Sequence, residues 1–201
     1  MRTSRLLLIG SAAVALGLVF GGIASGVFRQ AGTPSSVPDV RSSAGTRVTL
    51  ARFGRELGTA DRQLVLQRTP DGFICLWDSP DASGERGVGG CNSASDPLGG
   101  RKLFISLAYD GGPDVKTVTD ARLSGLLAVD VARVAIEMSD GTTRTAPALR
   151  GQITGGTVGP YRVFAYRIRQ ADLRAGATPV AVAALDATGN ELDRQTTGIG
   201  P

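Results

Sequence analysis

The chain has 201 residues, of which 22 are Lys or Arg and 18 are Asp or Glu, and it contains no histidine. The lack of histidine excludes Ser-His-Asp and Cys-His catalysis, and it excludes every metal site that needs an imidazole ligand. A content of 28 Gly and 10 Pro favours many short strands joined by turns over long helices.

An N-terminal segment, residues 6–28, is predicted to cross a membrane. It carries no charged residue, and Arg2 and Arg5 precede it. A helix of that length, at about 1.5 Å per residue, is long enough to span a hydrocarbon core of about 30 Å. An uncleaved anchor is favoured, because the apolar run continues to Phe28, past the small residues 24–26 where a signal peptidase would cut. Cleavage and secretion remain the alternative.

The basic residues before this segment predict a single pass, with the C-terminal domain outside the cell membrane. Small residues recur every fourth position along it, at Ala13, Gly17, Gly21 and Ser25. Such a stripe allows two helices to pack closely in lipid, so a homodimer through this helix is one hypothesis. The common use of Gly and Ala in export segments is the other explanation.

The segment 29–45 is rich in Pro and Ser and has no apolar periodicity, which predicts a flexible linker. Residues 46–201 are predicted to form one extracytoplasmic β domain. Its only two cysteines, Cys75 and Cys91, are predicted to form a disulfide, because a lone pair outside the cytoplasm is most simply explained that way. A catalytic thiol is the alternative, but no histidine is present to activate it.

Hairpin patterns dominate the predicted domain. The apolar runs 63–68 and 73–77 flank a Pro-Asp-Gly turn, and the run 131–138 alternates before Asp140-Gly141 and a β-branched return. Short strands with frequent turns predict a β-sandwich or barrel. The remaining predicted elements are strands at 103–109, 121–127, 142–145, 161–169, 179–185 and 191–194, one helical turn at 170–174, and an ambiguous strand or helix at 46–56.

Two of these segments, VARVAIEMSDGTTRTAP and PVAVAALDATGNELDR, resemble uncharacterised exported proteins of actinobacteria. The resemblance covers residues 121–194. It implies an immunoglobulin-like sandwich behind a single N-terminal hydrophobic segment, and it implies no established activity.

The densest carboxylate stretch contains Asp110 and Asp114, with Asp120 beyond. These residues are a weak calcium candidate, because carboxylates on a Gly-rich loop suit Ca²⁺, although the spacing does not match an EF-hand. A turn that uses Asp for local hydrogen bonds is the favoured interpretation, so no metal and no cofactor is predicted.

The arginines are scattered without a basic run, which predicts solvated side chains and no nucleic-acid partner. Trp77 is predicted to lie in the core. Together these features favour a non-enzymatic cell-envelope protein with a binding or structural role, whose partner is another envelope protein or a cell-wall component. A secreted carboxylate-dependent hydrolase, or its accessory domain, and a ligand-binding sensor remain as alternatives.

Overall fold

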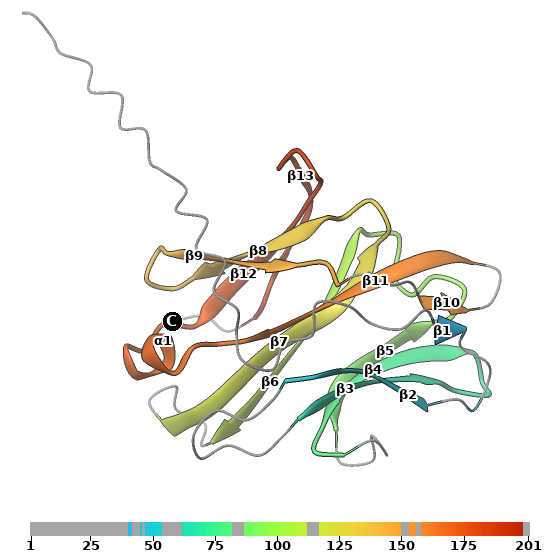
Figure 1. Ribbon diagram of the computed structural model, residues 1–201, viewed down its shortest axis with the longest axis horizontal. Coiled ribbons are helices and arrows are strands. Elements are labelled where there is room, and N and C mark those ends of the chain that lie inside the picture. Colours follow the sequence, from blue (N-terminus) through green and yellow to red (C-terminus); the bar gives the residue numbers. More distant parts are fainter. Residues whose placement is uncertain are drawn as a thin grey trace, which may run out of the picture.

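The computed structural model describes residues 40–41, 45, 47–53, 62–81, 87–111, 117–149, 153–155 and 158–198. Within these residues the chain is mainly β, with mostly antiparallel strands in three sheets and one short helix (Figure 1). The predicted hydrophobic segment 6–28 lies outside the described residues, as do the four small residues of its stripe. No helix in the described part of the chain is long and apolar enough to cross a membrane.

The N-terminal sheet is a four-stranded antiparallel meander with the order β2-β3-β4-β5. The predicted hairpin between its second and third strands is confirmed. Its turn places Gly72 at φ +88°, a conformation that glycine adopts without a steric cost. The strands are β2 (Arg47–Arg52), β3 (Gln63–Arg68), β4 (Phe73–Ser79) and β5 (Val88–Ser93).

The central sheet has the order β1-β10-β11-β7-β6. Its first strand, Val40–Arg41, falls inside the predicted linker and pairs in parallel with β10. All the other pairings in this sheet are antiparallel. The strands are β1 (Val40–Arg41), β6 (Leu103–Gly111), β7 (Val118–Ala128), β10 (Ile153–Gly155) and β11 (Val158–Arg167).

The C-terminal sheet has the order β13-β12-β8-β9 and contains the two remaining predicted hairpins, which are confirmed. The predicted helical turn is also confirmed as α1 (Gln170–Arg174), which connects the central sheet to β12. The strands are β8 (Arg133–Met138), β9 (Thr143–Pro147), β12 (Pro179–Leu185) and β13 (Glu191–Thr196).

The central sheet is covered on both faces, because alternate residues of its strands enter two different cores. Along β11, Val163 and Ala165 pack with apolar residues of the N-terminal sheet, whereas Phe164 and Tyr166 pack with β8 and β12. Figure 1 shows β7 and β11 running between the two outer sheets. The predicted sandwich is therefore correct as a packing of sheets face to face, and the described strands form three layers.

Trp77 does not lie in either core, contrary to the prediction. Its neighbour Leu76 points into the first core, so the alternation along β4 directs Trp77 to the opposite face of the N-terminal sheet. There the indole is half-buried, and its Nε1 donates a hydrogen bond to Gln67 Oε1 at 3.1 Å.

Candidate functional site

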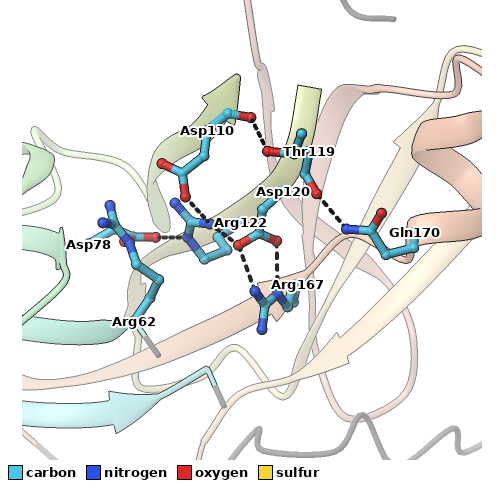
Figure 2. A network of polar contacts seen from close by, with 8 residues as sticks. All are labelled: Arg62, Asp78, Asp110, Thr119, Asp120, Arg122, Arg167 and Gln170. Atoms are coloured by element: carbon cyan, nitrogen blue, oxygen red, sulfur yellow. Dashed lines mark hydrogen bonds and ion pairs between the residues drawn. The ribbon is translucent and has the colours of Figure 1, made fainter. Parts of the chain in front are cut away.

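A cluster of opposite charges is buried between the N-terminal sheet and the central sheet (Figure 2). We call it the ionic cluster. Four of its side chains are only 1–2% exposed, and two further residues lie at its rim. The buried members are Asp78, Asp120, Arg122 and Arg167, and the rim members are Arg62 and Asp110.

Strand register brings the cluster together. Asp120 and Arg122 are two residues apart on β7, so both project from the same face of the central sheet. Arg167 lies directly opposite Arg122 on β11. Asp78, near the end of β4, reaches the same place from the N-terminal sheet. The cluster therefore joins two sheets through residues that are far apart in the sequence.

Arg122 is the centre of the ionic cluster. Its Nε donates a hydrogen bond to Asp78 Oδ2 at 2.5 Å, and its Nη1 donates to Asp120 Oδ2. Its Nη1 also lies 3.1 Å from Asp110 Oδ2. One guanidinium thus contacts carboxylates from three strands, as Figure 2 shows.

Each of the two buried carboxylates is held by two arginines. Arg167 makes a bidentate contact with Asp120, through Nε to Oδ1 at 2.8 Å and through Nη2 to Oδ2 at 2.7 Å. Arg62 Nε donates to Asp78 Oδ1 at 2.8 Å. Bidentate arginine–carboxylate pairs fix orientation as well as charge. The carboxylates act here as counter-ions, with their oxygens directed at guanidinium groups.

The charges of the ionic cluster balance, with three arginines against three aspartates. Burial alone would lower the pKa of Arg122, but the charges of Asp78 and Asp120 outweigh it and raise that pKa above its ordinary value. The Nη2 of Arg122 is buried and has no hydrogen-bond partner among the groups that the structure describes. Removal of one partner from a buried ion pair, such as Arg122 with Asp78, should cost stability, because the other charge stays buried without its partner.

A smaller group of charges ties α1 to β9. Asp172 accepts hydrogen bonds from Arg144, through Nε at 3.2 Å and Nη2 at 2.9 Å, and from Arg169 through the same two nitrogens at 2.9 and 2.7 Å. Burial would raise the pKa of Asp172, but the bonds from the two arginines outweigh burial and lower it. These hydrogen bonds hold α1, which follows β11 in the chain, against β9 of the C-terminal sheet.

Two of the three calcium candidates belong to the ionic cluster. Asp110 and Asp120 both contact Arg122, while Asp114 lies outside the described residues. The described residues contain no group of three or more acidic or cysteine side chains placed to hold a metal ion. The two described carboxylates are directed at arginine rather than at a shared empty position.

The predicted disulfide is confirmed. Cys75 and Cys91 lie directly opposite each other on β4 and β5, with their Cα atoms 4.0 Å apart. Cys75 is buried, whereas Cys91 is exposed. Since β5 has only β4 as a hydrogen-bonded neighbour in its sheet, the bond fastens an edge strand to the sheet.

The prediction that the arginines are solvated is wrong for Arg122 and Arg167, which are each 1% exposed. A local signal was present in the sequence, because Arg122 stands inside an apolar strand beside Leu123 and before Leu126. The sequence did not show that a further sheet would cover the face from which Arg122 projects.

No family model, curated protein or solved structure matches the chain. Its function therefore has to be inferred from its own strands, charges and disulfide.

Proposed function

We propose that the chain is an exported, non-enzymatic protein of the cell envelope, in which a layered β domain binds another envelope component or has a structural role there. The observation that carries the proposal is the disulfide between Cys75 and Cys91, since such bonds persist in oxidising compartments. The apolar segment 6–28 at the N-terminus supports the same location.

We infer further that residues 103–196 form an immunoglobulin-like unit. In that fold one sheet contains strands A, B, E and D, and the other contains C, F and G. The order β10-β11-β7-β6 corresponds to D-E-B-A, and the order β13-β12-β8 corresponds to G-F-C, with β9 at the position of C′. This correspondence supports the immunoglobulin-like fold that the resemblance to exported actinobacterial proteins implies.

On this proposal the N-terminal sheet is an addition that covers the A-B-E-D face of the unit. The ionic cluster fixes that addition, because Asp78 and Arg62 come from the N-terminal side and Asp120, Arg122 and Arg167 from the central sheet. A surface held rigid before binding loses less conformational entropy when a partner binds. The layered scaffold suits a recognition role for the loops at its ends.

The test is recovery of the full chain from intact cells after chemical crosslinking. We expect the chain to bring down an envelope protein or a cell-wall component, and cells that lack the chain provide the background. Recovery of nothing above that background would contradict a binding role. Hydrolysis of cell-wall glycans by the purified chain, lost on a single Asp→Asn change, would contradict the non-enzymatic assignment.

A further inference from the structure

The strand β5 depends on the disulfide for its attachment to the N-terminal sheet. It lies at the edge of this sheet, and β4 is its one hydrogen-bonded neighbour among the strands that the structure describes. Each of its six residues is exposed or half-buried, and none belongs to either core. The polar side chains of Asn92 and Ser93 bond to the turn that follows β5. The bond between Cys75 and Cys91 is therefore what ties a side chain of β5 to the sheet.

The two sulfurs of this disulfide differ in their access to solvent. Cys75 is 1% exposed, whereas Cys91 is an exposed residue. Phe73 and Trp77 lie two residues from Cys75 on either side, so their side chains flank it on the same face of β4. In thiol–disulfide exchange a thiolate attacks one sulfur and the other sulfur leaves. An external thiol therefore reaches the sulfur of Cys91, and Cys75 is the leaving group.

We propose that this disulfide is a redox switch, which a dithiol protein opens by attack on Cys91. A thiolate of that protein bonds to the sulfur of Cys91 while the bond to Cys75 breaks, and Cys75 leaves as a thiolate that takes a proton from water. The second thiolate of the dithiol protein then displaces Cys91, which is protonated in the same way. The dithiol is oxidised to a disulfide, and the chain is reduced to two thiols. The inference rests on the proposed function for the envelope location of this dithiol.

The hydrogen bonds between β4 and β5 define what the open switch releases. The amide of Ala94 donates to the carbonyl of Gly72, and bonded pairs alternate with non-bonded pairs along an antiparallel ladder. Gly90 and Asn92 therefore exchange backbone hydrogen bonds with β4, whereas Cys91 between them does not. After reduction these backbone bonds have to hold β5 without the covalent link.

Reduction is expected to detach β5, because ordering an edge strand with adjacent glycines and no buried side chain has a high cost in conformational entropy. Gly90 packs against the ring of Phe104, since a Cβ at Gly90 would lie 2.8 Å from the ζ carbon of that ring. When β5 leaves, the ring of Phe104 and the outward backbone groups of β4 become accessible. Oxidation restores the covered state, so the switch controls access to this edge of the sheet.

The first test is the site of attack in the purified, detergent-solubilised full chain, with glutathione as the probe thiol. At early times, after quenching in acid, peptide mass spectrometry should place glutathione on Cys91 and find Cys75 as a free thiol. The rate should stay constant at urea concentrations below the unfolding transition, because the exposed sulfur is reached in the folded state. Glutathione on Cys75, or a rate that rises with urea in parallel with global unfolding, would overturn the proposal.

Hydrogen exchange tests the release of β5. After reduction the amides of Gly90 and Asn92 should exchange on the order of a hundredfold faster, which corresponds to the chain entropy of a crosslink with a sequence separation of 16. The amide of Val65, on β3, should keep its protection. In the matched control, Cys75→Ser with Cys91→Ser, the β5 amides should exchange rapidly with or without reductant.

Unchanged protection of Gly90 and Asn92 after reduction would overturn the switch. Both tests use the purified chain, so their failure is distinguishable from failure of the envelope location, which is tested in intact cells.

Discussion

Replacing Arg122 by Met should destabilise the domain far more than removing a surface charge, because it leaves buried carboxylates with fewer counter-ions. Removing one partner of a buried ion pair costs about 3–5 kcal/mol. We expect the lower end, about 3 kcal/mol, because Asp78 keeps Arg62 and Asp120 keeps Arg167. For a domain of about 150 residues this corresponds to a fall in Tm of about 6–12 °C.

The assay is urea unfolding of the parent and the variant, followed by circular dichroism, with Glu137→Gln as the matched control. Glu137 pairs with Arg194 on the surface, where the two side chains are 40% and 43% exposed. Loss of this pair should cost less than about 1 kcal/mol. A double variant, Arg122→Met with Asp78→Asn, should lose less stability than the two single losses added together. Two results would refute the role given to the ionic cluster. One is an equal loss of unfolding free energy in R122M and E137Q. The other is a loss in the double variant that equals the sum of the losses in its two single variants.

Three further predictions concern single features. Reduction of the disulfide between Cys75 and Cys91, which closes a separation of 16 residues, should lower the free energy of unfolding by about 3 kcal/mol in urea titrations, and a chain lacking both cysteines should not respond to reductant. Gly125→Ala should destabilise the domain by at least about 2 kcal/mol in the same assay, because overpacking is costly, and a Cβ at this position would lie 2.1 Å from the carbonyl oxygen of Phe104. Asp186 should titrate at a pKa of about 2 in carboxyl NMR, since the hydroxyl of the neighbouring threonine and the amides of the same turn bond to its charged form. Because this pKa is depressed in the folded state, the stabilisation should be present above about pH 4 and lost as the pH falls through about 2, and an ordinary pKa would contradict the assigned turn bonds.

The hairpins could be predicted because their signals are local. The Pro-Asp-Gly turn before Phe73 and the Asp-Gly turn at Gly141 both place glycine at positive φ, as their sequences indicate. The flanking runs alternate with the period of a strand. The pairing of strands that are adjacent in the chain could therefore be predicted from the local sequence.

The third layer and the ionic cluster could not be predicted, because they depend on which sheets stack. On β7, Arg122 and Ser124 share one face, a pattern that is typical of a solvent-facing side. That face is buried only because the N-terminal sheet covers it. Both faces of β11 are apolar, with Val163 and Phe164 adjacent, as expected for a strand of a sheet that is covered on both sides.

The location of the domain, on which the proposed function depends, is tested most directly by the state of its two cysteines in intact cells. A membrane-impermeant maleimide should label neither Cys75 nor Cys91 before reduction, and it should label the exposed Cys91 after treatment of the cells with an impermeant reductant. Two reduced thiols that react only after the cells are lysed would contradict export, the disulfide and the envelope role together.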